Sequence, residues 1–104
     1  MNTKLIYVTV PSLAEAKQMA EAVVTEHLAA CANIFDGITS IFEWEGKLCH
    51  ENEVVLILKT SADRVDELTA RIKALHSYDC PCIIALPVES GNPDFLRWIS
   101  EQCS

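Results

Sequence analysis

The alternation of hydrophobic and polar residues predicts a domain that mixes strands with helices. Lys4–Val10 is rich in β-branched and aromatic residues and predicts a strand that Pro11 ends. Ser12 and Glu15 form a capping box, in which each side chain satisfies a free backbone N–H. A helix is then predicted to end near Ala29, with His27 as a partly buried packing residue. Its hydrophobic stripe consists of Leu13, Ala16, Ala20, Val23, Val24, His27 and Leu28.

A long β-hairpin is predicted next. Ala32–Trp44 has strand character, with a bend or bulge at Asp36-Gly37. Glu45-Gly46-Lys47 is typical of a tight turn, because glycine readily adopts the positive φ that such turns need. Leu48–Thr60 then returns as the second arm.

The rest of the chain completes an α+β pattern. Ser61 or Asp63 is expected to cap a second helix, whose hydrophobic stripe is Val65, Leu68, Ile72 and Leu75. Pro81 disfavours the helical conformation at Cys80, and Cys82–Val88 predicts a strand. Asn92 and Pro93 start a last helix. The order β-α-β-β-α-β-α predicts a ferredoxin-like split β-α-β sandwich with an additional C-terminal helix, as one domain over 1–104.

Two features of this sheet predict an oligomer. An arm of about 13 residues spans about 43 Å, whereas a domain of this size is roughly 35 Å across. The strands are also hydrophobic on both faces, as in Val54–Leu58 and Ile83–Val88. Because two main helices cover one face only, we expect the other face to meet another subunit. The alternative is that the C-terminal helix covers it.

Composition narrows the classes of partner. The chain has 15 acidic and 8 basic residues, a net charge of −7 and no cluster of Lys and Arg, which argues against nucleic acid as a partner. No apolar run approaches the roughly 20 residues of a membrane-spanning helix, so we expect no membrane partner. The five cysteines form no Cys-x-x-Cys pair. With no evident signal peptide, this pattern predicts reduced thiols and a cytoplasmic location.

One cluster carries ligand chemistry. His76, Asp79, Cys80 and Cys82 lie within seven residues, and imidazole, carboxylate and thiolate are ligands for copper or zinc. The alternative is that His76 caps the end of the second helix and the cysteines are small core residues. The sequence leaves both interpretations open.

Other candidate residues favour structural roles. Cys49-His50-Glu51 is interpreted as a solvated strand end, because His50 points away from the face that Cys49 and Glu51 share. Trp44, at the protruding turn, is typical of an interface residue. A glycine-rich phosphate loop, a nucleophile elbow and a zinc-protease helix are all missing from the sequence. We therefore expect a protein that is not an enzyme.

Several ordered motifs resemble the CutA divalent-cation tolerance proteins, from Val10-Pro11 to Trp98. The matching segments are Ala29–Ile34, Trp44–Lys47, Glu51, Glu53, Lys59-Thr60, Leu75-His76, Tyr78, Pro81 and Ile83–Pro87. The resemblance implies a cytoplasmic homotrimer of ferredoxin-like subunits, similar in architecture to PII signalling proteins. It also implies a role in tolerance of or response to divalent metal ions, copper binding in some members, and no known enzymatic reaction.

The chain departs from that family around the predicted ligands. Ser77 and Cys82 stand where a proline and a glutamate are usual. Val8 and Leu75 stand where a copper-binding member has a cysteine and the first of two histidines. His76 is retained from that ligand set, and Cys82 offers a substitute soft ligand.

Together these observations predict a trimeric protein that binds copper or another divalent cation near a subunit boundary. The predicted ligands are His76, Asp79, Cys80 and Cys82. The hairpin 32–60 and the second sheet face are expected to form the trimer interface. The alternative function is a PII-like signalling or interaction scaffold, which would bind a small molecule or a protein in the clefts between subunits.

Overall fold

The computed structural model describes residues 2–104 and contains the predicted elements in the predicted order. The elements are β1 (Thr3–Val10), α1 (Leu13–Thr25), β2 (Cys31–Trp44), β3 (Lys47–Ser61), a 3₁₀ turn (Ala62–Arg64), α2 (Val65–Leu75), β4 (Ile83–Val88) and α3 (Pro93–Gln102). Two of the predicted caps are present, since Ser12 Oγ accepts from the Glu15 backbone N–H and Asn92 accepts from that of Asp94. The cap predicted at Ser61 or Asp63 was wrong, because a 3₁₀ turn precedes α2 and these two side chains bond to each other. The α+β class is confirmed.

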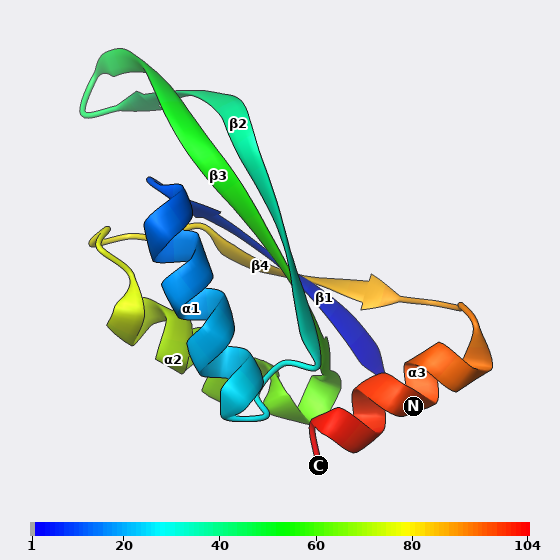
Figure 1. The fold of residues 1–104 in the computed structure, drawn as a ribbon. Helices are drawn as coiled ribbons and strands as arrows, with labels where there is room; N and C mark the ends of the chain where they lie inside the picture. Colours follow the sequence, from blue (N-terminus) through cyan, green and yellow to red (C-terminus); the bar gives the residue numbers. More distant parts are fainter. Residues whose placement is uncertain (1) are drawn as a thin grey trace.

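The four strands form one antiparallel sheet in the order β2-β3-β1-β4. Val8 in the central strand pairs with Leu56 on one side and with Ile83 on the other. This is the strand order of the split β-α-β sandwich, so the predicted ferredoxin-like topology is confirmed. In Figure 1, α1 and α2 lie together against one face of this sheet.

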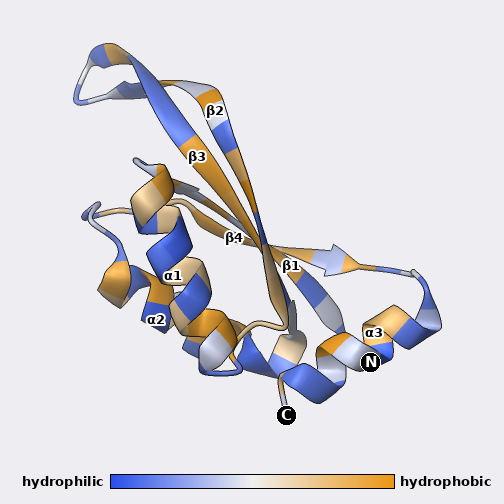
Figure 2. Ribbon diagram, in the orientation of Figure 1, coloured by the Kyte–Doolittle hydropathy of each residue, from blue (hydrophilic) through white to orange (hydrophobic). Residues whose placement is uncertain are grey.

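The core lies between that face and the two helices. Alternate residues of β1 and β3 point toward α1 and α2, and most of them are fully buried. The core side chains are Ile6, Val8, Val10, Val54, Leu56 and Leu58 from the sheet, with Ala16, Met19, Val23, Leu68 and Ile72 from the helices. Figure 2 shows this segregation, with hydrophobic residues in the inner part of β3 and hydrophilic ones toward the hairpin end.

Helix α1 ends earlier than the sequence predicted. His27 lies beyond the helix, is exposed, and has a left-handed φ of 61°. The N–H of His27 bonds to Val24 O and that of Leu28 to Val23 O, which is the Schellman arrangement. Glycine usually occupies the left-handed position, so its absence hid this helix end. The prediction that His27 packs within the helix stripe was therefore wrong.

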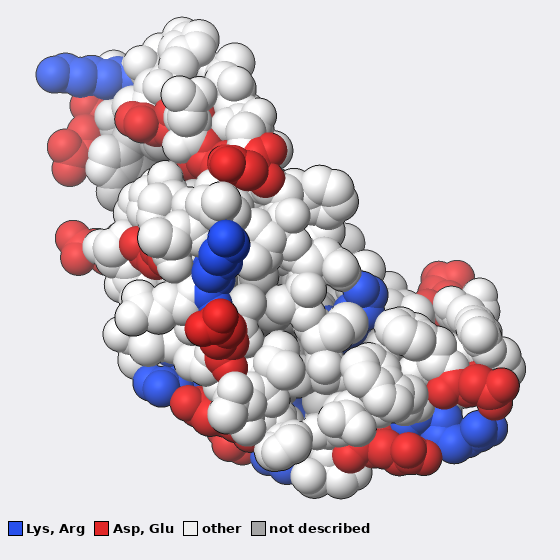
Figure 3. Space-filling model, viewed as in Figure 1, with Lys and Arg blue, Asp and Glu red and all other residues white. Residues whose placement is uncertain are grey.

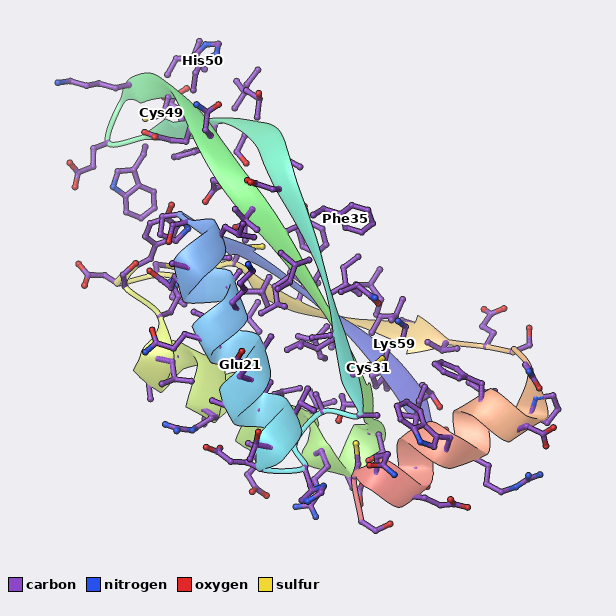
Figure 4. All side chains as sticks on the ribbon, viewed as in Figure 1. Glu21, Cys31, Phe35, Cys49, His50 and Lys59 are labelled. Carbon is purple, nitrogen blue, oxygen red and sulfur yellow. The ribbon has the colours of Figure 1, made fainter. Side chains whose placement is uncertain are left out.

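The opposite face of the sheet is open in the single chain. Ile84 and Leu86 of β4 remain 52% and 44% exposed, and Phe35 of β2 remains 58% exposed. Figure 4 shows Phe35 projecting away from α1. Helix α3 buries Ile99 and Cys103 against Ala30 at one end of the sheet, and does not cover this patch. Burial of the second face by another subunit stays a prediction.

The β2–β3 hairpin extends past the helices, and gives the chain extents of 45 × 25 × 22 Å. Its turn has φ of 51° at Glu45 and 77° at Gly46, the type I′ geometry that suits a two-residue hairpin turn. The predicted bulge is also present. Phe35 pairs with Val55 and Ile38 with Glu53, so β2 carries one extra residue at Asp36-Gly37.

Candidate functional site

The bulge decides which side chains of the outer hairpin share a face. Before the bulge, odd-numbered residues of β2 pair with odd-numbered residues of β3. After the bulge, even-numbered residues of β2 pair with odd-numbered residues of β3. Phe42 therefore pairs with Cys49, and Ser40 with Glu51, on the open face of the sheet. A straight β2 would have turned Phe42 to the other side.

A cleft of about 800 Å³ lies between this face of the hairpin and the α2–β4 loop. We call it the hairpin cleft. The outer hairpin forms one wall, the loop 77–82 forms the other, and the end of β1 lies between them. Its lining residues are Thr9, Pro11, Phe42, Trp44, Cys49, Glu51, Glu53, Ser77, Tyr78, Asp79, Cys80 and Cys82.

The loop wall is fixed to the body of the domain by His76. The His76 side chain is fully buried. Its Nε2 lies 2.8 Å from Thr9 O, and its Nδ1 accepts from the Tyr78 backbone N–H at 3.0 Å. A carbonyl only accepts and a backbone N–H only donates, so this arrangement requires the neutral ring with its proton on Nε2.

Glu15 of α1 supports the same loop. Its Oε2 accepts from both the backbone N–H and the Oγ of Ser77, each at 3.1 Å. The same oxygen lies 3.7 Å from His76 Nδ1. Four hydrogen bonds from the two side chains therefore hold the start of the loop against β1 and α1.

Tyr78 extends this loop across the cleft to the hairpin. Its hydroxyl donates to Glu53 Oε2 at 2.9 Å, and its ring lies 4.8 Å from that of His76. Glu53 is only 7% exposed. Burial is the main cause that raises the pKa of Tyr78 to about 12, followed by the hydrogen bond to Glu53 and the charges of Glu53, Glu51 and Glu15.

The cleft is acidic. Glu51, Glu53 and Asp79 line it, and no Lys or Arg does. None of these three carboxylates takes part in an ion pair within residues 2–104. Figure 3 shows acidic side chains along the outer hairpin and one basic side chain projecting at its tip. The cleft therefore carries negative charge that the described part of the chain does not neutralise.

The structure places the predicted metal ligands in two environments. Asp79, Cys80 and Cys82 line the cleft. His76 lies behind it with both ring nitrogens in hydrogen bonds, so ligation through His76 requires one of these bonds to break. Thiol and carboxylate donors suit copper or zinc. Across residues 2–104, however, no three His, Cys, Asp or Glu side chains approach closely enough to hold one ion.

Sequence reasoning missed the hairpin wall. Cys49 and Glu51 were interpreted as a solvated strand end, yet both line the cleft together with Glu53. These residues alternate along β3, and the bulge brings Phe42 and Trp44 to the same side. That alternation was a usable signal, but the opposing loop is distant in the sequence. In Figure 4, Cys49 and His50 lie at the far end of the hairpin, remote from Cys31 and Lys59 at its base.

No helix within residues 2–104 combines the length and the hydropathy needed to span a membrane.

Sequence and structure comparisons agree on the family. Residues 4–102 match the family model described as CutA1 divalent ion tolerance protein. The chain is 43% identical over 98 residues to the divalent-cation tolerance protein CutA of Thermus thermophilus, covering 94% of this chain and 95% of that protein. It is 44% identical over 95 residues to the chloroplastic protein CutA of Arabidopsis thaliana, covering 91% of this chain and 52% of that protein.

Solved structures agree as well. One is titled as the periplasmic divalent cation tolerance protein CutA from Archaeoglobus fulgidus, and it superimposes with a TM-score of 0.95 at 44% identity. The match covers 98% of this chain and 99% of that one. These descriptions name tolerance to divalent ions and no chemical reaction. The chain therefore belongs to the CutA1 divalent ion tolerance family.

Proposed function

We propose that this chain serves divalent-cation tolerance by binding copper or another divalent ion in the hairpin cleft, as a cytoplasmic homotrimer without catalytic activity. One observation carries the proposal: Asp79, Cys80 and Cys82, which the sequence selects as ligands, face a cleft whose other wall supplies Cys49, Glu51 and Glu53. Thiolates favour copper and zinc over magnesium or calcium.

The ion would bind at the loop side of the cleft. Asp79, Cys80 and Cys82 are the proposed donors, and His76 joins them only if it gives up a backbone hydrogen bond. Because these donors are not gathered in advance, the loop has to close on the ion, or a neighbouring subunit has to supply a further ligand. All five cysteines are free thiols, as a cytoplasmic location favours.

Exposed hydrophobic residues support the homotrimer. Phe35, Ile84 and Leu86 form a patch on the open face of the sheet. Ile41 and Leu48 are exposed on the side of the outer hairpin that faces away from the cleft. A patch of this kind marks an interaction site. A trimer in which each hairpin crosses to a neighbour covers both patches and leaves the cleft-facing side for a ligand.

Native mass spectrometry with added Cu²⁺ or Zn²⁺ tests assembly and metal binding together. Zn²⁺ is included because it has no redox chemistry, whereas thiols can reduce Cu²⁺. We expect a trimer that takes up one ion per subunit. A monomer at micromolar concentration contradicts the proposed assembly, and the absence of bound metal contradicts the proposed function.

Calorimetric titration with Zn²⁺ then identifies the donors. Replacing both Cys80 and Cys82 with Ser should abolish the binding signal, because Asp79 is a weak ligand for this ion, Cys49 lies on the opposite wall and both ring nitrogens of His76 are in hydrogen bonds. Cys31→Ser is the matched control, since Cys31 lies in the body of the sheet and does not line the cleft. Comparing His76→Ala with Tyr78→Phe separates loss of a ligand from loosening of the loop. Equal binding in the double variant and in the unmodified protein contradicts the proposed site.

A second candidate function is a PII-like scaffold that binds a small molecule in the cleft. The cleft volume of about 800 Å³ favours it, because ligand sites for small molecules typically measure about 300–1,000 Å³. Stabilisation by organic compounds but not by metal ions, in a thermal-shift measurement, would favour this scaffold.

A further inference from the structure

We propose that the hairpin cleft binds a small organic cation with protonated amino groups, held between aromatic side chains and carboxylates. This proposal names the ligand class for the scaffold function and rests on that function, but it does not depend on metal binding. It is drawn from the aromatic lining of the cleft, its unneutralised carboxylates, its size and its fixed loop wall.

Aromatic side chains come from both walls. Phe42 and Trp44 line the cleft from β2, and Tyr78 lines it from the opposing loop. Phe42 and Trp44 remain exposed in the single chain, although large apolar side chains are costly to leave in water. An amine cation over the face of an aromatic ring gains an electrostatic attraction that a neutral ligand of the same shape does not. The aromatic lining therefore favours a ligand that is both organic and positively charged.

The carboxylates set the sign of the ligand's charge. Glu51, Glu53 and Asp79 line the cleft, and no basic side chain among residues 2–104 forms an ion pair with them. Glu53 is the most informative of the three, because a glutamate residue with only 7% of its surface exposed normally has a charged partner. Its only hydrogen-bond partner in the described chain is the Tyr78 hydroxyl, on Oε2.

The second oxygen of Glu53 is available to a ligand. In residues 2–104, every side-chain nitrogen or oxygen that is fully shielded from solvent has a hydrogen-bond partner. Within residues 2–104, Oε1 of Glu53 has no hydrogen-bond partner, so it is exposed to solvent, and we infer that it faces the cleft that this residue lines. A protonated amine that donates to Oε1 supplies both the missing charge and the missing hydrogen bond.

Size separates this ligand from a bare metal ion. A metal ion needs several donors within about 2–2.6 Å, and no three candidate donors in residues 2–104 converge in this way. The cleft of about 800 Å³ instead has the volume of a site for a small organic molecule. Glu51 and Glu53 line the cleft from β3 and Asp79 lines it from the opposing loop, and carboxylates on both walls suit a ligand with more than one amino group.

The loop wall is already in position to bind. His76 holds the Tyr78 backbone, Glu15 holds Ser77, and the Tyr78 hydroxyl already contacts Glu53. A wall that is ordered before binding spares the ligand the entropic cost of ordering it. The affinity for an organic cation then depends on the aromatic and carboxylate contacts themselves.

The test compares 1,4-diaminobutane with 1,4-butanediol, which has nearly the same shape but no charge. Calorimetric titration of the full chain at neutral pH and low salt should show binding of the diamine and at least roughly tenfold weaker binding of the diol, as expected for the loss of charge–charge and cation–π contacts. Added salt should weaken diamine binding, because it screens the carboxylates. Equal affinity for the two compounds leaves the scaffold function intact and overturns the cationic ligand class.

Substitutions locate the binding. Trp44→Leu and Glu53→Gln should each weaken diamine binding by roughly tenfold, because each removes one of the attractions that select a cation. Phe95→Leu and Glu45→Gln are the matched controls, since neither residue lines the cleft. Circular dichroism of every variant establishes that it is folded. Diamine binding that survives both cleft substitutions overturns the proposed site.

Trp44 also provides a direct readout. In a Trp98→Phe background it is the remaining tryptophan, because the chain contains two. The diamine should change its fluorescence, and the diol should not. Zn²⁺ titration of Trp44→Leu is run in parallel, because metal binding at Cys80 and Cys82 does not use the indole. If neither organic compound binds while Zn²⁺ does, the cationic ligand class is overturned and the metal proposal stands, and the thermal-shift measurement decides on the scaffold.

Discussion

The inner and outer halves of the β2–β3 hairpin share one hydrogen-bonded ladder but differ in what covers them. In the inner half, Leu56 and Leu58 are fully buried beneath α1 and α2. In the outer half, which lies beyond the helices, Leu48 is 69% exposed and Ile41 is 62% exposed. The same backbone pairing therefore supports a packed core at one end and an almost bare ribbon at the other.

This difference locates the stability and the function in different places. A two-stranded ribbon without a covering layer is marginally stable in water, so the outer half depends on what it contacts. Within residues 2–104, one side-chain hydrogen bond joins the outer half of the hairpin to the body of the domain, and it runs from the Tyr78 hydroxyl to Glu53. The inner half therefore maintains the fold, and the outer half is the part that the proposed ligand or neighbouring subunit would complete.

The largest expected effect is on the free energy of unfolding, and it is seen by truncating one leucine in each half of the hairpin. Leu56→Ala should lower the free energy of unfolding by about 2–5 kcal/mol, because it leaves a cavity in a packed core. Leu48→Ala should change it by less than about 0.5 kcal/mol when measured at high dilution. Urea denaturation followed by circular dichroism measures both.

Repeating the measurement across protein concentrations sharpens the comparison. If Leu48 is buried between subunits, its truncation should become more costly as concentration rises, because assembly adds to the apparent stability. Leu56→Ala should be costly at every concentration. Similar costs for the two variants at high dilution would mean that the outer half is held as firmly as the core.

A smaller effect is expected where the loop wall joins the body. His76→Ala removes the donor to Thr9 O and the acceptor for the Tyr78 N–H. We expect the free energy of unfolding to fall by about 1–3 kcal/mol, because a partly buried acceptor loses its partner. The Tyr78 amide should exchange its hydrogen with solvent faster.

Ser77→Ala is the matched control for this loop. It removes the bond from Ser77 Oγ to Glu15 but keeps the one from the Ser77 backbone. Because this site is exposed, the change in stability should be small. If His76→Ala is equally mild, the histidine is not what fixes the loop, and a ligand role for His76 becomes more plausible than a structural one.

Patterns within short segments predicted most of the fold. The N-cap at Ser12, the turn at Glu45-Gly46 and the bulge at Asp36-Gly37 all depend on neighbouring residues, and each is present in the structure. The other half of the predicted capping box is not, because the Glu15 carboxylate accepts from Ser77 of the α2–β4 loop instead. The end of α1 was missed because His27 adopts the left-handed conformation that glycine usually signals. Local rules fail where an unusual residue fills a special backbone position.

The cleft was harder to predict because its walls are distant in the sequence. Asp79, Cys80 and Cys82 were selected as candidate ligands from their closeness along the chain, and they line the cleft; their role as ligands stays a prediction. The partnership of Glu53 with Tyr78 spans 25 residues and depends on how the loop crosses the end of the sheet. The two hydrogen bonds of His76 were equally hidden, since Thr9 is 67 residues away. Only packing in three dimensions distinguishes a buried structural histidine from a free ligand.

The smallest expected effect concerns the hydrogen bond between Tyr78 and Glu53, which joins the outer hairpin to the body of the domain. It is measured from the pH at which Tyr78 ionises. Burial, the hydrogen bond to Glu53 and nearby carboxylates raise the pKa of Tyr78 from 10.0 to about 12. The folded state therefore favours the neutral phenol. The stabilisation that results from the raised pKa of Tyr78 is fully present below pH 10. It declines as the pH rises from 10 and is lost above about 12.

Ultraviolet absorbance of tyrosinate should show a late ionisation that disappears in Tyr78→Phe, where Tyr7 is the remaining tyrosine. Glu53→Gln should lower the pKa of Tyr78, because it removes a negative charge beside the phenol. Glu45→Gln, away from the cleft, should leave it in place. If Tyr78 ionises near pH 10 in the unmodified protein, its hydroxyl is not held by Glu53 in solution. The outer hairpin would then lack its hydrogen bond to the body, and the cleft would not be formed before a ligand or a subunit arrives.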